Sequence, residues 1–408
     1  MDKRSFKMGT LTGVLTMCII GAVIFGGLKL TGHFYAKATG TQKASENADV
    51  IEKDTKRKLG LLSALVGHYY LYEDEVDEEM LEEGMYKGYI AALGDPYSCY
   101  YDEEATNDLL ENLSGEFEGI GAILQQSKGD GYVEVVSVYS TSPAKKAGLK
   151  NGDLITKVDD RETAGKDLSE VVSWIRGEKG TDVTLTVERK GADGVYSEKK
   201  ITVTRSVIEV ESVEHRMLDG KVGYIRISEF EDTTYEQFKG ALTELDEGGA
   251  KGLVIDLRDN PGGNLDTVCD MLDLILPKGT VVYTKDKYDK REDYKSDEAH
   301  KYEKPLCVLV NGHSASASEI FAGAVQDFEA GKIVGTTTYG KGVVQQIIDL
   351  KDGTSVKLTV AEYFTPDGRN INKKGIKPDV KVESGDDDIG GKVSKDKQLR
   401  RAIGELDL

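Results

Sequence analysis

The chain has few of the residues that usually build metal sites, disulfide frameworks or nucleic-acid surfaces. Its 408 residues include only four cysteines and five histidines. The cysteines form no C-x-x-C pair and have no metal-like spacing with the histidines, so we predict no metal, no cofactor and no disulfide framework. Lysine and arginine number 53 against 72 aspartates and glutamates, which gives a net charge of −19 at pH 7. So acidic a chain repels nucleic acid, which we therefore exclude as a partner.

One long apolar run is present, from Leu11 to Leu28, and a basic tip precedes it. Its length lies between that of a signal peptide and that of a membrane-spanning helix. The sequence Ala36-Lys37-Ala38 could be cut by signal peptidase, but it lies about ten residues beyond the run, which favours an uncleaved anchor. We expect residues 1–38 to form a cytoplasmic tip and a transmembrane anchor or signal. The body of the chain would then lie outside the cytoplasm, in a bacterial cell envelope, or be secreted if the segment is cleaved.

Residues 39–116 read as a polar linker followed by helices. Leu81, Met85 and Tyr89 recur at helical spacing, and Gly94 stands where a C-terminal cap is expected. The apolar face of this helix either packs inside the chain or joins two subunits. The pattern does not separate these alternatives, so it permits a homodimer.

Residues 117–207 combine short strand-like runs, such as 133–138 and 182–189, with a helical stretch at 168–177. Together with the strings "EGIGAIL" and "SPAKKAGLKNGDLITKVD", this order resembles a PDZ domain. Such domains bind the C-terminus of a peptide as an added strand and hold its carboxylate with the N–H groups of a glycine-containing loop. The resemblance places that peptide-binding loop at Gly119, Ile120, Gly121 and Ala122.

Residues 208–384 alternate between strand-like and helix-like segments. The expected strands are 221–227, 252–258 and 305–311, and the expected helices are 233–245, 265–275 and 316–328. Such alternation predicts an α/β core with a largely parallel sheet covered by helices. The tail, residues 385–408, is expected to form one last helix.

Three serines alternate in "HSASASEIFAGA", which begins at His313. Ser314 lies in a near match to the G-x-S-x-G nucleophile elbow, but Ser316 stands where the last glycine should be. Ser316 and Glu319 also form S-x-x-E, a capping box at the start of a helix, and Ser318 would lie in the first helical turn. From these residues alone, Ser316 is equally consistent with a helix cap and with a nucleophile.

A second strand-turn-helix unit, "LVIDLRDNPGGN", contains Gly262 and Gly263. The N–H groups of such a turn could hold an oxyanion. A tight turn that merely needs glycine is the simpler interpretation of this stretch by itself.

A third stretch, from Gly335 to Lys341, matches a phosphate-binding loop except that Gly342 replaces the Ser or Thr that holds magnesium. A strand-like run follows it instead of a helix, which disfavours ATP or GTP. Most lysines in such turns are solvated. A lysine buried beside Val343 and Val344 would have a lowered pKa, and in its neutral form it could take a proton from a serine.

These strings, followed by "YFTPDGRNINKKGIKPDV" and preceded by the PDZ-like region, resemble the carboxy-terminal processing peptidases, or tail-specific proteases, over about residues 60 to 383. The resemblance implies a crotonase-like α/β protease core with an inserted or preceding PDZ domain. It also implies a serine-lysine mechanism. Its residues would be Ser316 as nucleophile, Lys341 as general base, Gln345 as support for the lysine, and the N–H groups of Ala317 and of Gly262 or Gly263 as oxyanion donors.

The resemblance thus implies an exported serine endopeptidase that selects protein substrates by their C-termini. The alternative is a catalytically silent PDZ adaptor at the membrane surface, which shares every feature except a working serine-lysine pair. Penicillin-binding and β-lactamase enzymes are disfavoured because the chain has no K-T-G motif. HtrA-type proteases are disfavoured because G-N-S-G-G is absent and the protease-like part follows the PDZ-like part.

Overall fold

The computed structural model describes residues 53–127, 131–191, 193–297, 299, 302–383, 385 and 389–408. The apolar run from Leu11 to Leu28, predicted to be an anchor or signal, lies outside these residues. Within the described ranges, no helix combines the length and the apolar character that crossing a bilayer requires.

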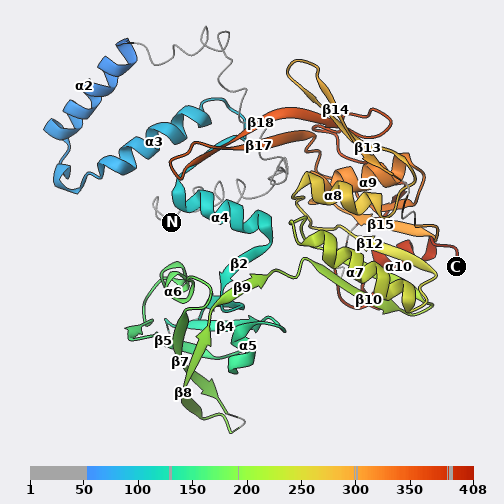
Figure 1. The fold of residues 1–408 in the computed structure, drawn as a ribbon, viewed down its shortest axis with the longest axis horizontal. Coiled ribbons are helices and arrows are strands. Elements are labelled where there is room, and N and C mark those ends of the chain that lie inside the picture. The colour runs from blue at the N-terminus through green and yellow to red at the C-terminus, as the bar shows by residue number, and fades with distance from the viewer. Residues whose placement is uncertain are drawn as a thin grey trace.

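The predicted N-terminal helices are present and project away from the rest of the molecule (Figure 1). They are α2 (Lys53–Tyr69) and α3 (Glu78–Ala91), with the short η2 (Glu73–Glu75) between them. Asp77 caps α3 by accepting hydrogen bonds from two first-turn N–H groups. Neither α2 nor α3 has a buried residue, so most of their apolar side chains are exposed, although Tyr86 of α3 packs against Tyr100.

Residues 99–116 contain more than the linker and helices expected there. β1 (Cys99–Tyr101) pairs with a strand of the C-terminal half, and α4 (Glu103–Ser114) follows it. The three residues of β1 are too few for a strand pattern to be recognised in the sequence. β1 therefore joins the N-terminal region to a distant sheet.

The PDZ-like region forms a separate module with its own hydrophobic core, at the lower end of the molecule in Figure 1. Its sheet has the order β3-β4-β5-β7-β8, and β6 pairs with β5. β2 and β9 form a two-stranded ribbon that leads into and out of the module. The elements are β2 (Glu116–Gly119), β3 (Ala122–Gln126), β4 (Val133–Val138), α5 (Pro143–Ala147), β5 (Leu154–Val158), β6 (Arg161–Glu162), α6 (Leu168–Ile175), β7 (Asp182–Lys190), β8 (Tyr196–Thr204) and β9 (Ser206–Glu209).

The predicted α/β core is present as a six-stranded sheet of order β10-β11-β12-β15-β16-β19, parallel except at β10. Residues of β15 alternate between its faces: Val308 and Val310 join the core under α7, α8 and α9, whereas Cys307 and Leu309 join the core under α10. The elements are β10 (Val213–Leu218), β11 (Val222–Ile227), α7 (Thr234–Glu247), β12 (Gly252–Asp256), α8 (Leu265–Asp273), β15 (Leu306–Val310), α9 (Ala317–Asp327), β16 (Lys332–Gly335), β19 (Val380–Lys381), η3 (Val393–Lys395) and α10 (Lys397–Gly404).

A second, antiparallel sheet lies beside α8 and α9 and extends toward α3 (Figure 1). It has the order β1-β18-β13-β14, and β17 pairs antiparallel with β18 over residues 355–362. Through β1, the N-terminal region is thus joined to the sheet that contains β17, the strand after Lys341. The strands are β13 (Gly279–Asp286), β14 (Arg291–Ser296), β17 (Val343–Asp349) and β18 (Ser355–Phe364).

Candidate active site

Of the three alternating serines, Ser314 and Ser316 lie between β15 and α9 and Ser318 lies in the first turn of α9; their hydroxyl groups differ in their hydrogen-bond partners. Ser314 donates to the carbonyl oxygen of Leu257 (2.7 Å), and Ser318 donates to that of Asn260 (3.0 Å). Both hydroxyls therefore hold the turn in place. The Oγ of Ser316 is buried and has no hydrogen-bond partner. Ser316 is the one of the three whose hydroxyl is available for chemistry.

The backbone of Ser316 is held in an unusual conformation, with φ of 54°. Its N–H donates to the Glu319 carboxylate (3.0 Å), and the Glu319 N–H donates to the Ser316 carbonyl oxygen (2.8 Å). The S-x-x-E pattern thus caps the helix through its carboxylate. The serine hydroxyl takes no part in this cap, because its Oγ atom has no hydrogen-bond partner.

Lys341 lies in the loop before β17 and is 1% exposed. Burial, and after it the like charge of Lys357, lowers the pKa of Lys341 to about 7, although Glu319 and Asp95 act in the opposite direction. The Lys341 amine lies 4.9 Å from the ring centroid of Tyr97. A lysine with this pKa is largely neutral just above pH 7 and can accept a proton.

Gln345 is buried in β17, four residues beyond Lys341 in the sequence. Its Nε2 group donates to the Oγ1 atom of Thr359 (3.2 Å), whereas its Oε1 atom has no hydrogen-bond partner. A buried amide oxygen without a partner is costly, so this atom is suited to accept a hydrogen bond from a neighbouring donor.

Two side chains hold the backbones of Ser316 and Lys341 together. The Glu319 carboxylate accepts from the Lys341 N–H (2.8 Å) and the Gly340 N–H (2.7 Å) in addition to the Ser316 N–H. The Tyr363 hydroxyl contacts the carbonyl oxygens of both Ser316 (3.1 Å) and Lys341. The sequence indicated only a local cap for Glu319 and nothing for Tyr363, because both bridges depend on the tertiary fold.

The glycines of the predicted oxyanion turn lie against different neighbours. A Cβ atom on Gly262 would lie 2.8 Å from the Cβ of Ser316, whereas one on Gly263 would lie 2.1 Å from the carbonyl oxygen of Phe230. The Gly262 N–H donates to the Oδ1 atom of Asn260 (2.8 Å). The structure therefore brings Gly262 next to Ser316, with its N–H already engaged. Ala317, the first residue of α9, is buried beside this turn.

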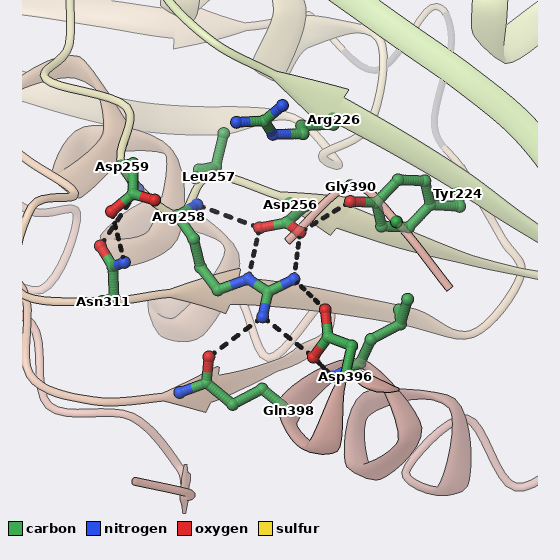
Figure 2. A network of polar contacts seen from close by, with 12 residues as sticks. Tyr224, Arg226, Asp256, Leu257, Arg258, Asp259, Asn311, Gly390, Asp396 and Gln398 are labelled. Carbon is green, nitrogen blue, oxygen red and sulfur yellow. Dashed lines mark hydrogen bonds and ion pairs between the residues drawn. The ribbon is translucent and has the colours of Figure 1, made fainter. Parts of the chain in front are cut away.

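Figure 2 shows the buried polar network that holds the strand end before this turn. The guanidinium of Arg258 makes ion pairs with Asp256 (2.5 Å) and Asp396 (2.6 Å), and it also donates to Gln398 (3.1 Å). The hydroxyl of Tyr224 donates to Asp256 (2.8 Å). Asp396 and Gln398 belong to the tail, so the C-terminal residues help to hold the chain just ahead of Gly262.

The predicted peptide-binding loop lies in the PDZ module, at the junction of β2 and β3. Gly121 has φ of 76°, and a Cβ atom there would lie 2.4 Å from the Cβ of Ser142. The Ile120 carbonyl accepts from the Ala144 N–H (2.9 Å), which fixes the loop against α5. β3 pairs only with β4 among the described strands, so its other edge faces away from the sheet.

Comparison with protein-family profiles supports three assignments. Residues 221–382 match peptidase family S41, residues 134–189 match a PDZ domain, and residues 17–105 match the N-terminal domain of the activating protease CtpB. These matches confirm the resemblance found in the sequence and the presence of a PDZ domain. Within the described residues, no group of three or more His, Cys, Asp and Glu side chains could hold a metal ion.

Individual relatives agree with these profiles. The carboxy-terminal processing protease CtpA of Bacillus subtilis (strain 168) is 41% identical over 76% of this chain and 66% of its own length, so the chain spans about two thirds of that relative. CtpB of the same organism is 36% identical over 91% of this chain and 76% of its own length. Among solved structures, a photosystem II D1 C-terminal processing protease is 31% identical over 73% of this chain and 80% of its own, with a TM-score of 0.44.

Proposed function

Because this chain belongs to peptidase family S41, we propose that it is a serine endopeptidase of the carboxy-terminal processing type. One observation carries the proposal. Ser316 has an unengaged hydroxyl at the start of α9, and Glu319 and Tyr363 connect its backbone to that of a buried lysine whose pKa is about 7.

We assign Ser316 as the nucleophile and Lys341 as the general base. The neutral Lys341 amine takes the proton of the Ser316 hydroxyl as its oxygen attacks a peptide carbonyl. In this structure the Ser316 Oγ has no hydrogen-bond partner, so the amine must approach it before transfer. The Oε1 atom of Gln345 is suited to accept a hydrogen bond from the amine and to orient it.

The attack produces an oxyanion, which N–H groups at the start of α9 and in the neighbouring glycine turn would stabilise. We assign the N–H of Ala317 and that of Gly262 or Gly263 to this role, and the Gly262 N–H would first have to leave the Oδ1 atom of Asn260. Losing one such donor costs about 3 to 4 kcal/mol in comparable sites. The protonated Lys341 then gives its proton to the leaving amine, and a water activated by the same lysine hydrolyses the acyl-enzyme.

The PDZ module would select substrates by their C-termini. The free edge of β3 can accept an added strand, and the loop at Gly119, Ile120, Gly121 and Ala122 lies at its start, where a terminal carboxylate would be held. We expect an amidated peptide to bind more weakly than the same peptide with a free carboxylate, because it cannot present that charge.

We further propose a homodimer and a membrane anchor. The apolar side chains of α2 and α3 are exposed, which is costly unless a second copy covers them. The apolar run from Leu11 to Leu28 and its basic tip favour an anchor, with the enzyme outside the cytoplasm.

The decisive experiment compares the full chain, purified in mild detergent, with Ser316→Ala and Lys341→Ala. The substrate is an unfolded protein with an apolar C-terminus. We expect both variants to lose at least about a thousandfold in kcat/KM while keeping the wild-type circular dichroism spectrum. Ser318→Ala is the matched control and should keep cleavage within about tenfold, because its hydroxyl only supports the turn.

Equal cleavage by the wild type and Ser316→Ala would overturn the proposal. If the folded wild type does not cleave but still binds C-terminal peptides, the protein is the silent PDZ adaptor instead.

A further inference from the structure

The turn between α3 and β1 lies against the predicted general base. It contains Asp95, Tyr97 and Ser98, from the string "GDPYS" that ends the N-terminal helices. The ring centroid of Tyr97 lies 4.9 Å from the amine of Lys341. The Asp95 carboxylate is close enough to raise the pKa of Lys341. A segment some 240 residues earlier in the chain thus forms part of the surroundings of the lysine.

Hydrogen bonds within the turn fix its shape. The Asp95 carboxylate accepts from the Tyr97 N–H (3.1 Å) and from the Ser98 hydroxyl (2.6 Å). The Ser98 N–H donates to the Asp95 carbonyl oxygen (3.3 Å). This pattern is an aspartate-stabilised turn, in which the side chain replaces backbone partners. The same hydrogen bonds therefore fix both the orientation of the Asp95 carboxylate and the backbone position of Tyr97.

The turn is docked onto β18 rather than merely passing over it. β1 pairs antiparallel with β18, with Cys99 opposite Lys357. The Thr359 N–H donates to the Ser98 Oγ (3.1 Å), and the Thr359 Oγ1 accepts from Gln345 (3.2 Å). A continuous set of hydrogen bonds therefore leads from Asp95 to Gln345, the residue expected to orient the lysine.

The charges around Lys341 oppose one another. Burial and Lys357 on β18 favour the neutral amine, whereas Glu319 on α9 and Asp95 favour the ammonium ion. Glu319 belongs to the α/β core, where four hydrogen-bond donors hold its carboxylate in place. Asp95, in contrast, belongs to the N-terminal region. Two further titratable groups face the site: the phenols of Tyr97, whose pKa burial raises to about 12, and of Tyr363, whose pKa burial also raises.

We propose that Asp95 and Tyr97 are positioning residues for the proton transfer, so that the N-terminal helical region completes the chamber of the catalytic base. This inference rests on the proposed role of Lys341. Proton transfer from Ser316 turns the amine into an ammonium ion. The Asp95 carboxylate and the face of the Tyr97 ring both stabilise that ion, and the ring also keeps water from it.

The test of Asp95 is the pH dependence of kcat/KM in the full-length protein. Asp95→Asn keeps the oxygen that accepts from the Tyr97 N–H but removes the charge. The pKa of Lys341 should fall, so more of the lysine is neutral at low pH and the acid limb of the profile should move to lower pH. Lys357→Met removes a like charge, so the same limb should move to higher pH. Opposite shifts from two neighbouring substitutions would not arise from a loss of stability.

The test of Tyr97 uses two substitutions. Tyr97→Phe keeps the ring and should keep kcat, whereas Tyr97→Leu should lower kcat about tenfold with little change in KM. Asp77→Asn is the control for the N-terminal region, because Asp77 caps α3 and an asparagine can still do so. It should leave the acid limb unchanged.

The outcomes separate this inference from the proposed function. If the wild type shows no cleavage that depends on Ser316, the proposed function is wrong. If the wild type cleaves, the inference is wrong when the acid limb of the kcat/KM profile of Asp95→Asn lies at the same pH as that of the wild type. It is also wrong when Tyr97→Leu has the same kcat as the wild type. In the inactive Ser316→Ala protein, NMR titration of Lys341 with 13C-labelled lysine should show the same opposite shifts without any catalysis. If Asp95→Asn does not fold, the two Tyr97 variants still decide.

Discussion

At the scale of single residues, the site combines a serine whose backbone conformation is strained with a lysine that is almost fully buried. Ser316 has a positive φ, which costs about 1 to 3 kcal/mol and persists only where neighbours hold it. Glu319 and Tyr363 supply that support through the Ser316 backbone. The hydroxyl of Ser316 is consequently left without a partner, and the same two residues hold Lys341 beside it.

Gly262→Ala tests how closely the glycine turn must approach Ser316. The residue has φ of 112°, and a Cβ atom would lie 2.8 Å from the Cβ of Ser316. We expect kcat/KM to fall at least about a hundredfold, since misplacing a nucleophile slightly has effects of this size. Steady-state kinetics and thermal unfolding would be measured together.

Gly220→Ala is the matched control for this substitution. Gly220 also has a positive φ, of 77°, but nothing lies within 4 Å of a Cβ atom there. It should lose about 1 to 2 kcal/mol of stability from the backbone alone and keep its activity. Activity in Gly262→Ala equal to that of Gly220→Ala would show that close packing against Ser316 is not required.

At the scale of elements, the C-terminal helix is part of the core rather than an appendage. α10 covers the face of the sheet opposite to α7, α8 and α9 and contributes Leu399 and Ala402 to the hydrophobic core there. Its capping residue, Asp396, accepts from the Leu399 N–H (2.8 Å) and pairs with Arg258 (Figure 2). One carboxylate therefore starts the helix and neutralises a buried guanidinium.

Asp396→Ala should destabilise the α/β core strongly. It leaves Arg258 buried with Asp256 as its remaining anion, and breaking a buried pair in this way costs about 3 to 5 kcal/mol. The midpoint of urea denaturation, followed by near-UV circular dichroism, measures the effect. Arg401→Ala, which breaks an exposed pair on the same helix, should change stability by less than about 1 kcal/mol. Similar midpoints for the two variants would contradict the structural role of the network.

At the scale of the whole molecule, a PDZ module and a pair of amphipathic helices extend from one side of the α/β core (Figure 1). The module has its own hydrophobic core and is joined through the β2–β9 ribbon, so the PDZ domain and the α/β core are separately packed units (Figure 1). α2 and α3 bury none of their residues. Leu62 is 51% exposed and Tyr89 is 55% exposed, which makes this region the natural surface for a second copy.

We expect the protein to sediment as a dimer and the variant Leu62→Glu/Leu65→Glu to sediment as a monomer. Charges on this face cannot be buried without partners. Ala64→Glu is the control, because helical spacing places Ala64 nearly opposite Leu62, and it should remain dimeric. Analytical ultracentrifugation in detergent-matched buffer measures both. A dimer that survives the double substitution would exclude this face as the contact.

Much of this organisation could be predicted from local patterns. The helices expected at 233–245, 265–275 and 316–328 are present as α7, α8 and α9, and the run after Lys341 is the predicted strand, β17. Strand β1 could not be predicted, because three residues show no periodicity and it forms only by pairing with β18. The catalytic roles of Ser316, Lys341 and Gln345 remain predictions until the variants are measured.

The sequence by itself determined the alternation of strands and helices, the PDZ domain and the family, because these depend on short-range periodicity and on ordered motifs. Only the tertiary structure decided which serine hydroxyl is unengaged and how far the pKa of Lys341 falls. Both depend on burial and on groups distant in the chain, such as Asp95, Lys357 and Tyr363. A side chain's protonation is determined by everything packed around it, and the linear sequence does not state that packing.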